Sequence, residues 1–182
     1  MTPLLRIITP EQYQTSPWKN GGGITHEITR KAVGDSWEWR LSIAEVASDG
    51  PFSHFPGMSR ILTVIEGEGI DLHSPYGIQK ARLNQPILFS GDLDVNSTLV
   101  SGAIRDFNLI YDSKVVSAVV QVLSGPGKID TTDATTGFLC LSGSVSASNQ
   151  PVPVGAFALT TDADITLGTD AHGILLTLRD LT

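Results

Sequence analysis

The sequence predicts an all-β protein, and three observations support this prediction. The 182 residues include 18 glycines and 10 prolines, which favours many turns and short strands over long helices. Several short apolar segments rich in β-branched residues are each closed by glycine or by a turn sequence. No long amphipathic helical pattern occurs anywhere in the chain. Many short strands separated by turns are typical of a β-sandwich or β-barrel.

The N-terminal region is expected to contain a strand at residues 4–8, followed by about one turn of helix. The sequence TPE at residues 9–11 favours a helix start, because it offers a cap, a first-position proline and a first-turn acid. Ser-Pro at residues 16–17 ends this helix. Residues 18–23 (WKNGGG) are then expected to form a loop, since consecutive glycines suit a sharp turn or a close backbone contact.

Alternation of apolar and polar residues predicts the next strands. Ile24, His26 and Ile28 share one face of a strand at residues 24–30. The strand at residues 37–46 has Trp37, Trp39, Leu41 and Ile43 on one face and Glu38, Arg40, Ser42 and Ala44 on the other. Further strands are expected at residues 60–65, 70–73, 78–83, 86–89, 95–100, 104–111, 115–123, 137–141, 155–160, 164–167 and 173–178. The turn at residues 74–77 makes 70–73 and 78–83 a hairpin.

Net charge and cysteine content limit the classes of partner. The 12 Lys and Arg against 19 Asp and Glu give a net charge of -7, which argues against nucleic acid or an anionic membrane as partner. The lone Cys140 lies in an apolar run, so we expect a buried, inert thiol. The N-terminal sequence lacks the pattern of a signal peptide, and no apolar run is long enough to span a bilayer. A cytoplasmic location is therefore expected.

The segment at residues 50–69, GPFSHFPGMSRILTVIEGEG, resembles the first motif of the cupin barrels. In a metal cupin, two histidines and a glutamate of this motif point into the barrel and bind a divalent cation, and a glycine closes the motif. The corresponding positions here are His54, Pro56, Arg60 and Gly67. Proline has no side-chain ligand atom, and a guanidinium group repels a cation. The resemblance thus implies a barrel in which a cationic side chain replaces the metal, and no metal or other cofactor is expected.

A wider set of segments resembles the HutD/Ves family of cupin-like proteins. These segments are WKNGGG at 18–23 with Thr25 and Glu27, WRLSIA at 39–44, GPFS at 50–53, FPG at 55–57, Arg60, Glu66-Gly67 and DFN at 106–108. The resemblance implies two cupin barrels in one chain (a bicupin), at residues 1–112 and 113–182, in a bacterial cytoplasmic protein. Weak similarity between residues 63–70 and 138–145 agrees with a shorter, degenerate second barrel.

The two branches of this family imply different roles. The HutD branch implies control of histidine utilisation through sensing of a pathway intermediate such as urocanate or formylglutamate. The Ves branch implies a stress-linked protein. The residues of this chain do not distinguish the two branches.

A ligand site is expected around Arg60, which by this resemblance points into the barrel. Alternation puts Leu62, Val64 and Glu66 on the face of Arg60. A guanidinium group binds a carboxylate through two parallel hydrogen bonds, and aromatic side chains can sandwich a planar ligand. The candidate ligand-binding residues are Trp18, Lys19, Asn20, Arg40, Phe52, Arg60, Glu66, Asp106 and Asn108. The expected partner is a small carboxylate.

Several of these residues have an alternative structural interpretation. A buried arginine requires a partner, so Arg60 either binds a ligand or pairs internally with Glu66, Glu27 or Asp106. In this interpretation Arg40 is a charge on the protein surface. Asp106 and Asn108 would then form hydrogen bonds to the backbone of a nearby loop. The scattered histidines His26, His54, His73 and His172 form no metal-binding motif.

Three functions compete at this point. The first is a metal-free binding or regulatory protein for a small carboxylate. The second is a metal-independent isomerase or hydrolase that uses Glu66, Glu27 or Asp106 as general base. The third is a structural or protein-interaction role, in which side chains fill the barrel and no cavity lies beside Arg60. Exposed edge strands of such barrels pair between subunits, so a homodimer is a further expectation.

Overall fold

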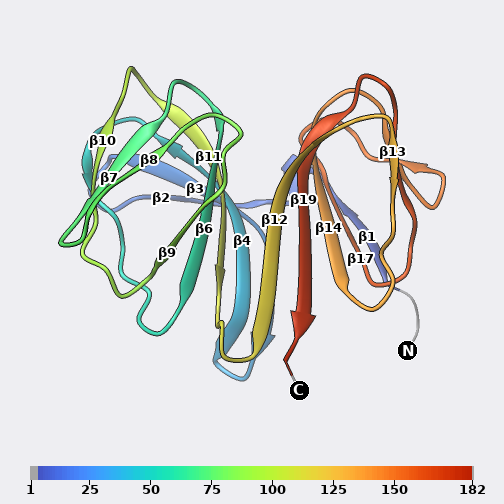
Figure 1. Ribbon diagram of the computed structural model, residues 1–182, viewed down its shortest axis with the longest axis horizontal. Helices are drawn as coiled ribbons and strands as arrows, with labels where there is room; N and C mark the ends of the chain where they lie inside the picture. The colour runs from blue at the N-terminus through green and yellow to red at the C-terminus, as the bar shows by residue number, and fades with distance from the viewer. Residues whose placement is uncertain (1–3, 182) are drawn as a thin grey trace. The chain divides into compact units, whose positions relative to one another are not determined.

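The computed structural model describes residues 4–181, and in this range the all-β prediction is confirmed. The helical content of these residues is one 3-10 turn, η1 (Pro10–Gln12), at the predicted helix start. Strands and turns make up the rest of the ordered structure (Figure 1). Within the described residues, no helix has the length and apolar character that crossing a bilayer requires.

The chain divides into two compact units. One unit comprises Gln14–Ser113. Of the described residues, the other combines residues 4–13 with residues 114–181. From the sequence we expected residues 1–112 to form the first unit. The difference arises because β1 (Leu5–Ile8) pairs antiparallel with β17 (Phe157–Thr160), which belongs to the C-terminal unit.

The unit formed by residues 14–113 contains two antiparallel sheets. The larger sheet has the strand order β2 (Gln14–Pro17), β3 (Gly23–Val33), β4 (Ser36–Val46), β11 (Ile104–Tyr111), β6 (Ser59–Glu66) and β9 (Ile87–Ser90). The smaller sheet has the order β5 (Gly50–Pro51), β10 (Asn96–Leu99), β7 (Ile70–Ser74) and β8 (Gly77–Ala81). Apolar residues of both sheets form one buried cluster, which includes Leu62, Val64, Ile70 and Leu72. The inner face of the larger sheet therefore packs on a core shared with the smaller sheet.

The other unit also contains a larger and a smaller antiparallel sheet. The larger sheet has the order β1, β17, β14 (Thr135–Ser142), β19 (His172–Asp180) and β12 (Val116–Ser124). The smaller sheet has the order β13 (Gly127–Ile129), β18 (Ile165–Leu167), β15 (Val145–Ala147) and β16 (Gln150–Pro151). Its buried cluster includes Phe138, Cys140 and Ile165. Burial raises the pKa of the Cys140 thiol, in agreement with an inert side chain.

Several short strands differ from the sequence-based expectation. Residues 14–17 form the edge strand β2, whereas the sequence suggested a helix end at Ser16-Pro17. Proline lacks a backbone donor and is tolerated on a sheet edge. The two-residue and three-residue strands β5, β13, β15 and β16 also escaped prediction, because segments this short carry no readable alternation.

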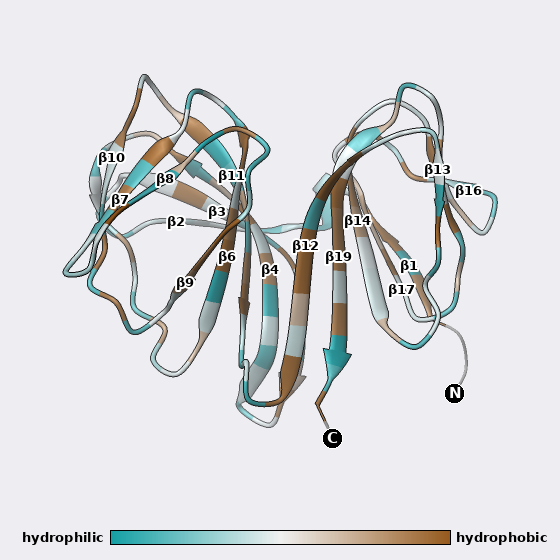
Figure 2. Ribbon diagram, in the orientation of Figure 1, coloured by the Kyte–Doolittle hydropathy of each residue, from teal (hydrophilic) through white to brown (hydrophobic). Residues whose placement is uncertain are grey.

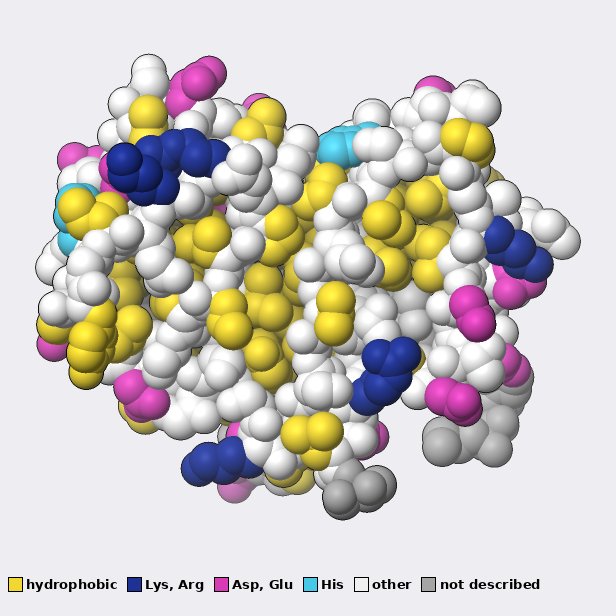
Figure 3. Space-filling view, in the orientation of Figure 1, with side chains coloured by type: hydrophobic (Ala, Val, Ile, Leu, Met, Phe, Trp, Pro, Cys, Tyr) yellow, Lys and Arg dark blue, Asp and Glu magenta, His cyan; other side chains and the backbone are white. Residues whose placement is uncertain are grey.

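Surface and strand polarity agree with the patterns in the sequence. β6 is hydrophobic over most of its length and hydrophilic at its start, where Ser59 and Arg60 lie (Figure 2). On the face shown in Figure 3, Lys and Arg occur in small separated groups among neutral and acidic side chains. This face presents no continuous basic surface.

Candidate functional site

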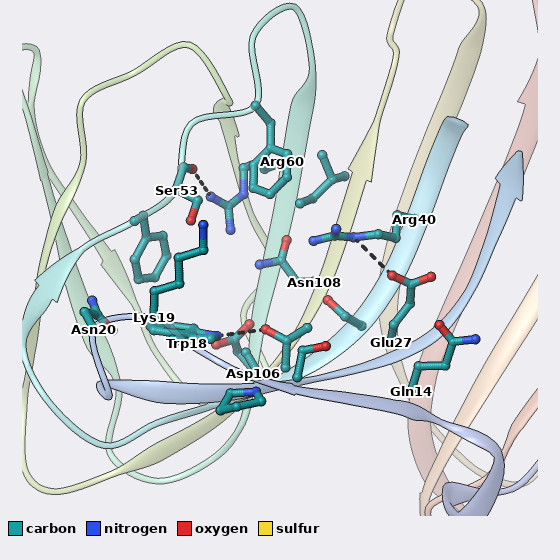
Figure 4. Close-up of a pocket in the computed structure, with 18 of the residues that line it drawn as sticks. Gln14, Trp18, Lys19, Asn20, Glu27, Arg40, Ser53, Arg60, Asp106 and Asn108 are labelled. Atoms are coloured by element: carbon teal, nitrogen blue, oxygen red, sulfur yellow. Dashed lines mark hydrogen bonds and ion pairs between the residues drawn. The ribbon is translucent and has the colours of Figure 1, made fainter. Parts of the chain in front are cut away.

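A cavity of about 770 Å³ lies within residues 14–113, and the view in Figure 4 looks into it. Its wall is built from strands β2, β3, β4, β6 and β11, the loop at residues 18–20 and the segment at residues 51–55. The lining residues are Gln14, Ser16, Pro17, Trp18, Lys19, Asn20, Thr25, Glu27, Arg30, Arg40, Ser42, Ala44, Pro51, Phe52, Ser53, Phe55, Arg60, Asp106, Asn108 and Ile110. Eight of the nine candidate residues are therefore brought together, and Glu66 is not among them.

Arg60 is a buried cation on this cavity. It lies near the start of β6, and only 6% of the residue is exposed. One terminal nitrogen donates a 3.3 Å hydrogen bond to the Ser53 carbonyl, and Nε has no hydrogen-bond partner among the described residues. Burial lowers the pKa of Arg60 to about 10, with a smaller lowering from Arg40 and an opposing effect from Asp106. The guanidinium group therefore stays charged at neutral pH.

Aromatic rings surround this guanidinium group. Its central carbon lies 5.2 Å, 5.3 Å and 5.0 Å from the ring centroids of Phe52, Phe55 and Phe89. Such rings attract a cation through their electron-rich faces, but they offer no oxygen to accept hydrogen bonds from the N–H groups of the guanidinium. In the described residues, no carboxylate forms an ion pair with Arg60 that would satisfy those donors.

Asp106 and Asn108 face the same cavity from β11. Strand alternation puts both side chains on one face, and they are 1% and 6% exposed. Both carboxyl oxygens of Asp106 and Oδ1 of Asn108 lack a hydrogen-bond partner. Burial raises the pKa of Asp106 to about 7, and the nearby Arg60 charge opposes this rise. The Asp106 carboxyl group therefore titrates near neutral pH.

Arg40 supplies a second guanidinium group from β4. Its central carbon lies 5.4 Å from the Trp37 ring centroid and 5.2 Å from that of Phe55. Burial lowers its pKa, while Glu27 raises it and Arg30 lowers it. Arg40 Nε is 3.9 Å from Glu27 Oε2, whereas Arg30 Nε is only 2.8 Å from Glu27 Oε1. Two arginines therefore share one carboxylate, and Arg40 is left incompletely neutralised.

The loop at residues 18–23 is held in place by its own hydrogen bonds. The Trp18 amide donates to the Gly23 carbonyl at 2.9 Å, and the Trp18 indole donates to Thr25 Oγ1 at 2.8 Å. A Cβ on Gly23 would lie 2.5 Å from the Glu45 carbonyl oxygen and 3.0 Å from the Trp18 ring. The glycine run thus permits close packing of this loop on β4.

Two loop side chains complete the site. The Trp18 ring meets the Phe52 ring edge-on at a centroid distance of 6.4 Å. The side chain of Lys19 extends toward Ser53 and Arg60 (Figure 4). Asn20 Oδ1 accepts a 2.9 Å hydrogen bond from the Gly22 amide, so Asn20 also shapes the loop. These residues bring an amine, an amide and an aromatic surface to the cavity.

Glu66 lies outside the cavity, contrary to the expectation that it shares the inward face with Arg60. It is the last residue of β6, and its side chain is 67% exposed and 3.3 Å from the Arg105 guanidinium group. The pairing of β6 with β11 shifts register between Arg105 and Asp106, so inward alternation does not continue to Glu66. Of the alternative internal partners considered for Arg60, Glu66 pairs with Arg105 and Glu27 pairs with Arg30, and neither forms an ion pair with Arg60 in the described residues.

The cavity also contains residues that were not among the nine candidates. Strand alternation puts Ser42 and Ala44 on the same face of β4 as Arg40, and Ile110 on the same face of β11 as Asn108. Their position on the cavity could therefore be predicted from the sequence. Trp37 does not line the cavity, but it is partly buried and the Arg40 guanidinium carbon lies over its ring. Phe55 contacts both Arg40 and Arg60, and nothing in the local sequence indicated this role.

The residues at the cupin metal positions do not fit a metal. His54 is half exposed and lies 2.7 Å from Asp94 Oδ1, and Pro56 and Arg60 offer no ligand atom. Within residues 4–181, no group of three His, Cys, Asp or Glu side chains is arranged to hold a metal ion. The chemistry of the cavity is instead that of cationic and hydrogen-bonding side chains.

Comparison with known proteins gives the family. The model of the HutD family matches residues 10–179. This chain belongs to the HutD family. An uncharacterised 21.2 kDa protein in the hutC 3' region of Pseudomonas putida is 38% identical over 152 residues, which cover 79% of this chain and 77% of that protein. Protein Ves of Escherichia fergusonii is 38% identical over 109 residues, covering 58% of this chain and 56% of Ves.

Solved structures show the same fold. A conserved protein of unknown function from Pseudomonas aeruginosa PAO1 is 35% identical, with a TM-score of 0.85 over 97% of this chain and 99% of that one. HutD from Pseudomonas fluorescens SBW25 is 30% identical, with a TM-score of 0.86 over 98% of this chain and 100% of HutD. The Escherichia coli pirin YhhW shares the fold alone, at 7% identity and a TM-score of 0.71 over 98% and 100% of the two chains. The expected HutD/Ves membership and all-β cupin-like fold are confirmed.

Proposed function

We propose that this protein binds a small carboxylate in the cavity and acts as a metal-free regulatory protein in histidine utilisation. The observation that carries the proposal is the buried Arg60 guanidinium group, whose Nε has no hydrogen-bond partner. A buried charge without hydrogen-bonded partners destabilises a fold. A protein can keep such a destabilising buried charge when a ligand supplies the missing hydrogen-bond partner. Energetically unfavourable features of this kind concentrate at functional sites.

The charge of the cavity wall supports an anionic ligand. Four cationic side chains (Lys19, Arg30, Arg40 and Arg60) and two acidic ones (Glu27 and Asp106) line it, although the whole chain carries a net charge of -7. Arg30 and Glu27 largely neutralise each other. The Arg40 and Arg60 groups lie on the same Phe55 ring and repel each other, so a carboxylate near both relieves this repulsion.

The size and aromatic surface of the cavity support a small, partly planar ligand. A volume of about 770 Å³ is in the range of small-molecule sites. Phe52, Phe55 and Trp18 offer flat apolar surface beside the cations. An open cavity at this position also favours ligand binding over a barrel filled with its own side chains.

The family suggests which acids to test. The similarity to HutD, and to a protein named for the hutC region, favours a role in histidine utilisation. We infer that the input is an intermediate of histidine degradation, such as urocanate or formylglutamate.

A metal-independent enzyme is the second candidate, because Asp106 has a pKa raised to about 7 and faces the cavity. A general base works best when its pKa is near the operating pH. This candidate predicts chemical turnover. The regulatory proposal predicts that each acid is recovered unchanged after prolonged incubation, as analysed by mass spectrometry.

Thermal unfolding with a panel of acids tests the proposal. The panel contains urocanate, formiminoglutamate, formylglutamate, histidine and glutamate, with the methyl ester of each acid as a control. A ligand at about 100 times its dissociation constant stabilises by about 2.7 kcal/mol. For a chain of this size we expect a rise in melting temperature of roughly 5–10 °C. Absence of any shift, or an equal shift with the uncharged ester, would contradict carboxylate binding.

A further inference from the structure

Three acceptor atoms on β11 face the cavity without a donor. They are both carboxyl oxygens of Asp106 and Oδ1 of Asn108. We infer that the ligand carries an N–H donor in addition to its carboxylate, and that Asp106, with Asn108 beside it, accepts this donor. The inference rests on the proposed function, since it concerns the second half of the same ligand.

The position of Asp106 explains why the protein does not satisfy it. In the larger sheet, Asp106 pairs with Ala44 of β4 and with Val64 of β6, and neither side chain can donate a hydrogen bond. Asp106 is 1% exposed, so bulk water reaches it poorly. A buried acceptor in this position lowers the stability of the folded state unless a group in the cavity donates a hydrogen bond to it.

Several donors near Asp106 are already directed elsewhere. The Trp18 indole N–H donates to Thr25 Oγ1 at 2.8 Å. The Arg60 terminal nitrogen donates to the Ser53 carbonyl at 3.3 Å, and Arg30 is bound to Glu27. In Figure 4, Asp106 lies beside Trp18, on the opposite side of Asn108 from the Arg40 guanidinium group. The acceptor atoms are thus left for a molecule in the cavity.

The need for a donor holds in both protonation states of Asp106. The charged and titratable groups that line the cavity around it are Lys19 from the loop, Glu27 and Arg30 from β3, Arg40 from β4 and Arg60 from β6. With its carboxyl group ionised, Asp106 offers two acceptor oxygens. With a proton bound, it still offers one, and Asn108 offers another. A ligand that presents only a carboxylate leaves all of these acceptors unpaired when Asp106 is ionised. When Asp106 is protonated, its own O–H can pair with Asn108 Oδ1 or with the ligand carboxylate, and an acceptor oxygen of Asp106 still remains.

The cavity therefore has two chemical ends. Arg60 and Lys19 suit a carboxylate, while Asp106 and Asn108 suit an N–H group of an imidazole ring or of an amide. Trp18 and Phe52 line the same cavity and offer flat surface for a planar linker. The ligand class is a short acid that carries a planar N–H group, rather than a simple carboxylate.

Two acids matched in shape test this assignment. Urocanate is an acrylate that carries an imidazole ring, and the furan-substituted acrylate has the same acid and a similar flat ring without an N–H donor. Isothermal titration calorimetry of the wild-type protein should give tighter binding of urocanate by about 10-fold to 100-fold, as expected for a buried hydrogen bond to a charged or polar acceptor. In Asp106→Leu this preference should fall to less than about 3-fold, as no charged acceptor remains.

Controls separate specificity from folding. Asn108→Leu removes only the neutral acceptor, so this variant should retain part of the preference for urocanate. It replaces Asp106→Leu in the test if Asp106→Leu does not fold. Glu66→Gln changes an exposed carboxylate outside the cavity and should leave both affinities unchanged. Equal affinity of the two acrylates for the wild-type protein would overturn the inference while leaving carboxylate binding intact. Failure of both acrylates and of every acid in the thermal panel would instead overturn the proposed function.

Discussion

Replacing Arg60 with methionine is expected to weaken carboxylate binding by at least about 100-fold, since a charge-assisted, bidentate contact is lost. The same change should leave the ligand-free protein as stable as wild type, or more stable by about 1 kcal/mol. Arg60 is 6% exposed and has a single hydrogen bond, so methionine removes a poorly compensated charge and keeps most of the apolar contact with the phenylalanine rings. Calorimetric titration and thermal unfolding measure the two effects.

Arg105→Met is the matched control for this substitution. Arg105 lies on β11, is 43% exposed and contacts Glu66 outside the cavity, so its loss should not change ligand affinity. The alternative interpretation of Arg60 as an internal salt bridge predicts the reverse outcome. In that case Arg60→Met would destabilise the protein by about 3 kcal/mol or more and would leave the affinity of the folded variant unchanged.

Replacing Asp106 with asparagine is expected to stabilise the ligand-free protein in a pH-dependent manner. The carboxyl group has a pKa of about 7 in the folded protein, against an ordinary value of 3.8, because burial disfavours its charge. The folded state thus binds more protons than the unfolded state between these values, and stability decreases as the pH rises from about 4 to about 7. The corresponding free energy is on the order of 2–4 kcal/mol, and asparagine, which has no charge to bury, should recover it at about pH 8.

Urea unfolding of the two proteins across this pH range measures the difference. We expect similar stability near pH 3, where Asp106 is mostly protonated in both folded and unfolded states, and a growing advantage of Asp106→Asn toward pH 8. Glu66→Gln controls for the removal of an exposed carboxylate. A constant stability difference between the two proteins at all pH values would show that Asp106 does not titrate within this range in the folded state.

Much of the site could be predicted because strand alternation and motif position act locally. The alternating pattern of β4 placed Arg40, Ser42 and Ala44 on one face, and the structure has all three on the cavity. The replacement of the cupin glutamate by Arg60 indicated where a cation replaces the metal. Both inferences depend on the strand itself and need no knowledge of distant contacts.

The rest depended on contacts between distant residues. By simple alternation Glu66 should share the inward face of β6 with Arg60. It points outward because the pairing of β6 with β11 shifts register next to Asp106 and because β6 ends at Glu66. The pairing of β1 with β17 joins segments about 150 residues apart, so no local pattern could assign residues 4–13 to the C-terminal unit. Phe55 gains its role from two arginines on different strands, which alternation within one strand cannot reveal.

The central claim, that a ligand carboxylate binds Arg60 in the cavity, is tested most directly by nuclear magnetic resonance. The side-chain Nε–H signal of Arg60 in a proton–nitrogen correlation spectrum can be assigned by its loss in Arg60→Met. During titration with an acid that raises the melting temperature, we expect this signal to shift progressively to saturation, because Nε lacks a hydrogen-bond partner in the ligand-free protein. Saturable binding of that acid without any change in the Arg60 signal would contradict the account.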